Sequence, residues 1–181
     1  MKLYFAYGAN LNMESMRWRC PDAVPVKAMY LSDYRLAFSG VATIQPSPGE
    51  FVPGALWSIT EKCEAALDVF EGFPTLYRKE TIEVDGEPVM FYVMNHDSPG
   101  EPSVNYLMTI AEGYQDWRLE LDDLWSAVRI TQEESYDLQR STTTRNHPMG
   151  GSLENDLYME SGNDLRWLRD DEPTHRDPAP F

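Results

Sequence analysis

Cysteine and histidine are scarce in this chain of 181 residues, which contains two cysteines and three histidines. Cys20 and Cys63 lie far apart and form no C-x-x-C motif, and His96, His147 and His175 are equally scattered. Metal sites and redox motifs need such residues at close, regular spacing. We therefore expect two ordinary thiols and no metal site.

Basic side chains are also few. The sequence has 15 Lys and Arg residues against 30 Asp and Glu residues, which gives a formal net charge of −15. Proteins that hold phosphate backbones without regard to sequence rely on clustered Lys and Arg. The charge balance therefore argues against nucleic acid as a partner.

Long hydrophobic runs are missing as well. No apolar run approaches the ~20 residues of a membrane-spanning helix, and Met1 and Lys2 lead directly into a predicted strand, which leaves no room for a signal peptide. We expect a soluble, cytoplasmic protein without a membrane partner. An apolar fraction of 42% supports a buried core, and the length suits one domain with a tail.

The chain opens with the pattern of a strand followed by a turn. From Leu3 to Tyr7, aromatic and apolar side chains alternate at a period of two, as in a half-buried strand. Gly8 is expected to end the strand with a positive φ and to allow a close approach to the main chain. Asn12 can cap a short helix that begins at Met13. Backbone amides at such a turn suit a carboxylate or a developing oxyanion.

Further strands are predicted from aromatic and aliphatic runs bounded by turn residues. Asp85 and Gly86 form a two-residue hairpin signal between two of them. Residues 45–49, rich in proline, are expected to form a loop. The predicted strands are Val26–Phe38, Val41–Ile44, Phe51–Ile59, Tyr77–Val84 and Glu87–Asn95.

Helices are predicted where the apolar period changes to that of a helix. Apolar residues recur at helical spacing between Cys63 and Phe70, where Thr60 can cap the helix and Gly72 can end it. Two more helices are expected, one from Ser103 to about residue 117 and one from residue 121. These elements predict an α+β domain, with six or so strands forming a small, mainly antiparallel β-barrel with flanking helices. The pattern alone leaves an open sheet as an alternative.

The C-terminal part has a weaker pattern. We expect a domain over residues 1–130 and, over residues 131–181, an acidic extension that is partly disordered or docked on the body. Residues 141–144, a Ser followed by three Thr, look like a loop.

Glu71 is the candidate catalytic residue. It falls in the last turn of its predicted helix, where the helix dipole opposes negative charge, and Phe70, Phe73 and Pro74 flank it. Both effects favour the protonated carboxyl and predict a pKa raised toward neutrality, which suits a group that takes and returns a proton. The alternative is a solvated carboxylate at a helix end. Asp68, one turn earlier, is expected to be a hydrogen-bond anchor or a surface residue.

Five stretches in order resemble the γ-glutamylcyclotransferase family, over roughly residues 2 to 120. Residues 7–11, Y-G-A-N-L, resemble the family signature Y-G-S-N-L, with Ala9 in place of the usual serine. The change removes one hydroxyl and leaves the backbone donors. The other stretches are Ala42–Ile44 with Pro48 and Gly49, Val52–Trp57, Leu67–Gly72, and Tyr77 with Ile82–Val84; the match continues through Pro102–Tyr106.

The resemblance implies an enzyme that cyclises a γ-glutamyl amine or amino acid to 5-oxoproline without a cofactor and releases the free amine. Glu71 would be the general acid and base. A small-molecule γ-glutamyl substrate is the implied partner of a monomer or homodimer. The residues expected to bind it are Tyr4, Phe5, Ala6, Tyr7, Gly8, Ala9, Asn10, Tyr77 and Tyr106.

Two other functions stay open on the sequence. One is an enzyme that removes a γ-glutamyl protecting group in a biosynthetic or nucleotide-modification pathway. The other is a non-catalytic module that binds a small ligand. Glu71 favours catalysis, because a pure binding module has no need for such a carboxylate. Arg17 and Arg78 could pair with a carboxylate by charge alone, and we do not place them in the site.

Overall fold

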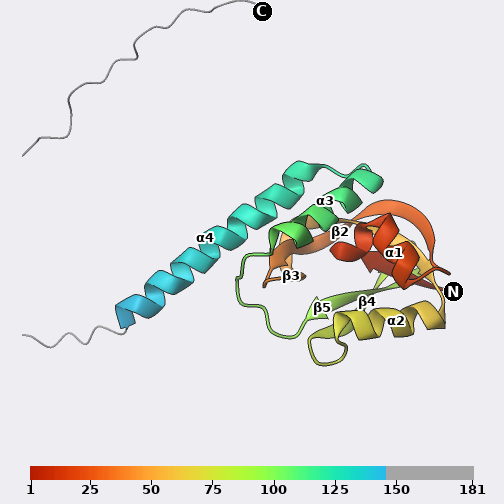
Figure 1. Ribbon diagram of the computed structural model, residues 1–181, viewed down its shortest axis with the longest axis horizontal. Coiled ribbons are helices and arrows are strands. Elements are labelled where there is room, and N and C mark those ends of the chain that lie inside the picture. Colours follow the sequence, from red (N-terminus) through yellow and green to blue (C-terminus); the bar gives the residue numbers. More distant parts are fainter. Residues whose placement is uncertain (146–181) are drawn as a thin grey trace, which may run out of the picture. The chain divides into compact units, whose positions relative to one another are not determined.

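The computed structural model describes residues 1–145 of the chain. Strands and helices follow one another along the sequence, as Figure 1 shows. The elements are β1 (Lys2–Ala6), a 3-10 turn η1 (Ala9–Leu11), α1 (Met13–Arg19), β2 (Val24–Phe38), β3 (Ala42–Ile59), α2 (Glu61–Glu71), β4 (Tyr77–Val84), β5 (Glu87–Met94), α3 (Val104–Asp116) and α4 (Leu121–Arg145). This is the predicted α+β class.

The strands form one sheet in the order β2-β3-β1-β5-β4. β1 lies in the centre, antiparallel to β3 and parallel to β5. The expected closed barrel is wrong, because β2 and β4 at the two ends of this order do not pair. The sheet curls far enough for the Tyr34 hydroxyl of β2 to lie 3.4 Å from a Glu80 carboxylate oxygen of β4. Side chains therefore meet where a barrel would close, and the main chains do not.

The predicted loop over residues 45–49 is also wrong, since this segment is part of the single long strand β3. There are five strands in the sheet instead of the six expected. Tyr34 of β2 pairs with Pro46, while β1 pairs with β3 only from Ala55 to Ile59. β3 thus has a ladder partner on one side alone near its prolines. A proline without an N–H is tolerated in a strand with one free edge.

The predicted hairpin turn and the predicted helix caps are confirmed. Asp85 and Gly86 connect β4 to β5 with φ values of 53° and 82°, as a two-residue hairpin turn requires. Asn12, Thr60 and Ser103 each accept a hydrogen bond at a helix N-terminus from a backbone N–H three residues on. α2 ends at Gly72 in the left-handed conformation (φ 64°).

Helix α3 packs closely on η1 and fixes its position. A Cβ atom at Gly113 would lie 2.7 Å from the Asn12 nitrogen, so only glycine allows this approach. The Trp117 indole N–H donates to the Leu11 carbonyl oxygen at 2.8 Å, and Glu112 accepts from the Asn12 amide at 3.0 Å. These contacts hold the turn that follows β1.

Helix α4 extends beyond the predicted boundary at residue 130 and continues to Arg145. The predicted loop over residues 141–144 is therefore wrong. Thr131 is buried and its hydroxyl oxygen accepts the Phe38 backbone N–H, while Glu134 pairs with Arg35 at 2.7 Å. Contacts with β2 thus support the helix where its apolar stripe weakens. In the described part of the chain, no helix is long and apolar enough to cross a membrane.

The Thr131 contact gives a first prediction. Thr131→Val keeps the shape of the side chain and leaves the buried Phe38 N–H without its acceptor. We expect a loss of about 1–3 kcal/mol in the free energy of unfolding, measured by urea denaturation. Thr142→Val, at an exposed position of the same helix, should cost much less. Equal effects of the two changes would show that the Thr131 contact contributes nothing of its own.

Candidate active site

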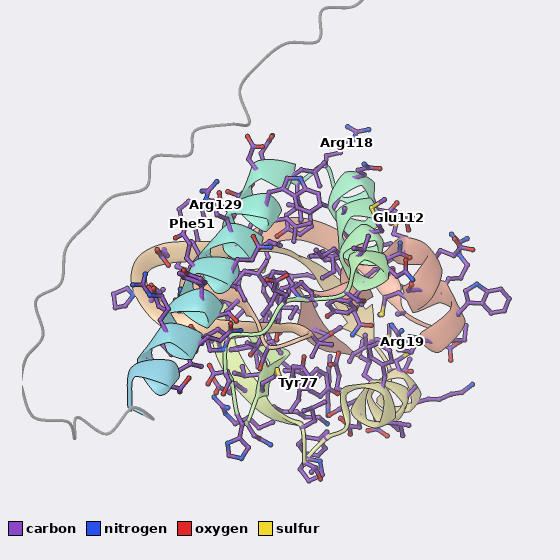
Figure 2. All side chains as sticks on the ribbon, turned by 60° about the vertical axis from the view of Figure 1, so that its left-hand side comes forward. Arg19, Phe51, Tyr77, Glu112, Arg118 and Arg129 are labelled. Carbon is purple, nitrogen blue, oxygen red and sulfur yellow. The ribbon has the colours of Figure 1, made fainter. Side chains whose placement is uncertain are left out.

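A pocket opens at the end of β1, where α2, α3 and the sheet meet. It encloses about 300 Å³ of empty space, part of which is open to solvent. Figure 2 labels Tyr77, which comes from β4, and Arg19, which lies at the end of α1 near α2. The residues that line it are Tyr4, Tyr7, Gly8, Ala9, Asn10, Ala42, Phe70, Glu71, Tyr77, Tyr92 and Tyr106.

Glu71 is the acidic residue of this lining. The residue as a whole is half-buried, whereas its carboxyl group is largely removed from water. This burial raises the pKa of Glu71 to about 7, against the weaker opposing effects of Arg19 and of a hydrogen bond from Asn10. The Asn10 side-chain nitrogen donates to Glu71 Oε1 at 2.7 Å. A carboxyl with such a pKa can exchange protons near neutral pH.

The apolar surroundings of Glu71 differ from those expected. Phe70 does line the pocket, but Phe73 is 39% exposed and its ring lies under the Lys79 ammonium. Neither Phe73 nor Pro74 contributes to the lining. Tyrosine side chains from β1, β4, β5 and α3 remove most of the water from the carboxyl instead.

Three of the five tyrosines in the lining donate their hydroxyl protons within the protein. Tyr7 donates to the Tyr92 carbonyl oxygen at 2.6 Å, and Tyr77 to the Ala42 carbonyl oxygen at 2.6 Å. Tyr92 donates to Asp68 Oδ1, also at 2.6 Å. A phenol has a single proton to donate. These three tyrosines therefore shape the pocket and have no donor left for a ligand.

Tyr4 and Tyr106 differ from the other three. The Tyr4 hydroxyl oxygen accepts from the Asn10 amide at 2.9 Å, and the Tyr106 hydroxyl oxygen accepts the Ala42 backbone N–H at 3.1 Å. Within residues 1–145, the structure records no acceptor for the hydroxyl proton of either residue. Both can thus donate a hydrogen bond to a molecule in the pocket.

Gly8 has a different role from the one expected. Its φ of −113° is not positive, so the backbone conformation alone does not require glycine. A Cβ atom there would lie 3.1 Å from the Ala42 Cβ and 3.2 Å from the Tyr106 hydroxyl. Glycine avoids these tight contacts, because both α3 and β3 come close to the chain at this point, and a side chain here would have to shift its neighbours.

Most of the predicted binding residues come together in the pocket, but Phe5 and Ala6 do not line it. Phe5 is fully buried in the core against Gly54, and Ala6 is fully buried in β1. Alternation along the strand could have indicated this for Phe5, because Tyr4 faces the pocket and its neighbour faces the opposite side. The prediction for Asp68 is confirmed, since it anchors Tyr92 and pairs with Lys79 at 2.7 Å.

Three residues at or beside the site were not predicted from the sequence: Arg19, Ala42 and Tyr92. The burial of its helix explains the position of Arg19. Met16, three positions earlier, is fully buried, so a residue at this spacing lies on the same inward face. Arg17 is exposed, and Arg78 donates to the Met94 carbonyl oxygen and to Glu80. In the described residues, no three His, Cys, Asp or Glu side chains gather where they could hold a metal ion.

Comparison with known proteins agrees with the geometry of this site. The family model described as gamma-glutamyl cyclotransferase, AIG2-like, matches residues 4–119. The chain belongs to this family. The matched region includes the pocket and every residue that lines it.

Individual relatives carry the same name as the family. The chain is 31% identical over 138 residues to a gamma-glutamylcyclotransferase of Bos taurus, which covers 66% of this chain and 73% of the relative. It is 32% identical over 132 residues to that of Mus musculus, covering 63% and 70%. A solved structure named gamma-glutamyl cyclotransferase superposes with a TM-score of 0.59 at 27% identity, covering 67% of this chain and 82% of the other.

The close contacts of Gly8 give a second prediction. In Gly8→Val, the added side chain must displace Ala42 or the Tyr106 hydroxyl. Displacement of Tyr106 would move a hydrogen-bond donor away from the pocket. We expect a reduction of at least roughly tenfold in affinity for 5-oxoproline, measured by calorimetry. Ala9→Ser, at the next position, should bind nearly as the unchanged protein does. Full affinity in Gly8→Val would mean that this approach does not shape the binding site.

Proposed function

We propose that this protein cyclises a γ-glutamyl amine or amino acid to 5-oxoproline and releases the free amine, with Glu71 as general acid and base. The observation that carries the proposal is the pocket carboxyl with a pKa of about 7 beside two phenols that can donate. The names of the relatives support the same activity.

The reaction moves two protons from the attacking nitrogen, which changes from an α-ammonium to a lactam N–H, to the leaving nitrogen, which departs as an ammonium. The α-amine of the substrate attacks its own γ-carbonyl carbon, so that a C–N bond forms in the new ring and the original amide C–N bond breaks. Ionised Glu71 takes one proton from the α-ammonium and gives it to the leaving nitrogen, and it then transfers the second proton from the ring nitrogen to the free amine in the same way, so that it ends ionised. The nucleophile and the electrophile belong to one molecule, so the protein mainly supplies orientation and charge stabilisation.

The free donors suit the charge that develops on the substrate. Tyr4 and Tyr106 can donate to the γ-carbonyl oxygen as it becomes an oxyanion, or to the α-carboxylate. The amides of the turn from Tyr7 to Asn10 add main-chain donors, because the first N–H groups of a helical turn have no partner within it. The change from serine to Ala9 leaves these donors in place. The Asn10 side chain, in contrast, is already occupied by other residues.

The raised pKa of Glu71 favours a cyclising enzyme over a simple binding module, because a binding module gains nothing from a carboxyl group that is costly to ionise. Removal of a γ-glutamyl protecting group would use the same chemistry on another amine. We further propose that the protein is cytoplasmic and acts on a small molecule as a monomer or homodimer. Light scattering of the purified chain would decide between the two assembly states.

The acid and base role gives a third prediction. Ionised Glu71 is the active form, so kcat/KM for a γ-glutamyl substrate should rise with pH and level off above about 7. Glu71→Gln should lower kcat by roughly 10²–10⁴-fold, because glutamine keeps the shape but cannot carry the proton. The assay is release of 5-oxoproline from a panel of γ-glutamyl compounds. A Glu71→Gln protein that keeps its full rate would rule out the role.

The raised pKa also predicts an effect on stability. Between the usual pKa of 4.5 and about 7, the folded protein binds the Glu71 proton more tightly than the unfolded chain does. Stability is therefore lost as pH rises through this range. Glu71→Gln removes this loss. At pH 8 its free energy of unfolding should exceed that of the unchanged protein by an amount on the order of 1–3 kcal/mol. At pH 4 the two proteins should be nearly equal in stability.

Thermal melts of the two proteins at both pH values would measure this difference. Glu83→Gln, an exposed change on β4, serves as the matched control and should show no such pH dependence. A Glu71→Gln protein that gains nothing at pH 8 would contradict the costly ionisation of the carboxyl, whatever its activity.

A further inference from the structure

We propose that Arg19 is a positioning residue, which fixes the orientation of the Asn10 side-chain amide and through it the places of Glu71 and Tyr4. This inference rests on the proposed function of Glu71. It begins with the Asn10 side chain, which is almost fully buried and uses both of its N–H donors and its oxygen in hydrogen bonds. The side-chain nitrogen donates to Tyr4 and to Glu71, while its oxygen accepts from Arg19.

The direction of the amide decides whether the site works. An asparagine amide has a donor end and an acceptor end of nearly the same shape, so it can rotate by half a turn and exchange them. In the exchanged position, Asn10 Oδ1 would face the Glu71 carboxylate, and two acceptors would oppose each other. A guanidinium has donors only. Arg19 can therefore donate only to the oxygen end of the amide, which keeps the nitrogen end toward Glu71 and Tyr4.

Arg19 is itself held in place by the elements around it. Its guanidinium carbon lies 3.4 Å from the centre of the Phe70 ring of α2. Met16 in α1 and Cys20, directly after the helix, are buried, and the Cys20 thiol lies 3.6 Å from the Cys63 carbonyl oxygen. The end of α1 is thus fixed against α2, the helix that carries Glu71. Figure 2 shows Arg19 in this position.

The charge of Arg19 acts on Glu71 without a direct ion pair. Within residues 1–145, the structure records no contact of this kind between the two side chains, yet Arg19 works to lower the pKa of Glu71. The titratable and charged groups around the carboxyl come from α1, β1, β4, β5 and α3. They are Arg19, Tyr4, Tyr7, Tyr77, Tyr92 and Tyr106. Arg19 is the cation among them.

The test compares Arg19→Met with Arg19→Lys and with Arg17→Met. Methionine keeps much of the stem that packs on Phe70 but has no charge and no donor, while lysine keeps the charge. Arg17, exposed on the same helix, is the matched control. Two quantities are measured: the kinetic constants with a γ-glutamyl compound, and the pKa of the Glu71 carboxyl by carbon NMR of protein labelled at glutamate. The Glu71 signal is the one absent from Glu71→Gln.

In Arg19→Met, we expect the pKa of Glu71 to rise by about one unit and kcat to fall roughly 10- to 100-fold, with a smaller change in KM. Arg19→Lys should recover part of both effects, and Arg17→Met should show neither. If Arg19 only packed on Phe70, methionine would replace its stem and the pKa of Glu71 would not change. An unchanged titration and kcat in Arg19→Met would overturn the inference. Should Arg19→Met fail to fold, Arg19→Gln is read in the same way.

The two measurements separate this inference from the proposed function. If Glu71→Gln stays active while the Glu71 pKa moves in Arg19→Met, Glu71 is not the acid and base, yet Arg19 does control its titration. If Glu71→Gln is inactive and the pKa in Arg19→Met does not move, the proposed function stands and Arg19 is not a positioning residue.

Discussion

The burial of one carboxyl group is the constraint on which the rest of the site depends. An ionised carboxylate in a poorly hydrated pocket is costly unless hydrogen bonds or a nearby cation stabilise it. Too little stabilisation would leave Glu71 always protonated, and too much would leave it always ionised. With one donated hydrogen bond and one cation at a distance, its pKa comes near neutrality. The surroundings of Glu71 thus balance two opposing effects.

This balance needs parts of the chain that are distant in sequence. Glu71 comes from the end of α2, Asn10 from the turn after β1, and Arg19 from the end of α1. Helix α3 holds the turn through Trp117 and the close approach at Gly113. The pocket therefore exists only in the folded domain, and the packing of α3 on the turn is as much a part of it as the residues that line it.

Local signals in the sequence predicted the local features well. Thr60 and Gly72 mark the ends of α2 through backbone hydrogen bonding and a left-handed conformation, which a few neighbouring residues determine. Glu71 could be singled out for the same reason, since its place in the last turn follows from that helix. The prolines near Pro46 led to the wrong prediction of a loop, because their effect depends on whether a second strand lies beside β3. Strand partners are a property of the whole fold.

The side chains that assist Glu71 could not be predicted in the same way. Which tyrosines keep a free proton depends on where each hydroxyl finds an acceptor, and for Tyr77 this is a carbonyl oxygen 35 positions away in the chain. Arg19 and Arg17 are alike in sequence, and only the direction of α1 against α2 separates them. Pattern and spacing name the candidate acid and base, while its partners require the three-dimensional structure.

The indirect contact between Arg19 and Glu71 has a chemical advantage over a direct ion pair. A guanidinium in contact with the carboxylate would lower its pKa by about 1–3 units and so weaken it as a base near neutral pH. The neutral amide of Asn10 bonds to both residues. Arg19 can therefore fix the orientation of the amide beside Glu71 without placing its positive charge in contact with the carboxylate. Glu71 is thereby held in a defined position and still keeps a pKa of about 7, which allows it to take a proton from one nitrogen and return it to another.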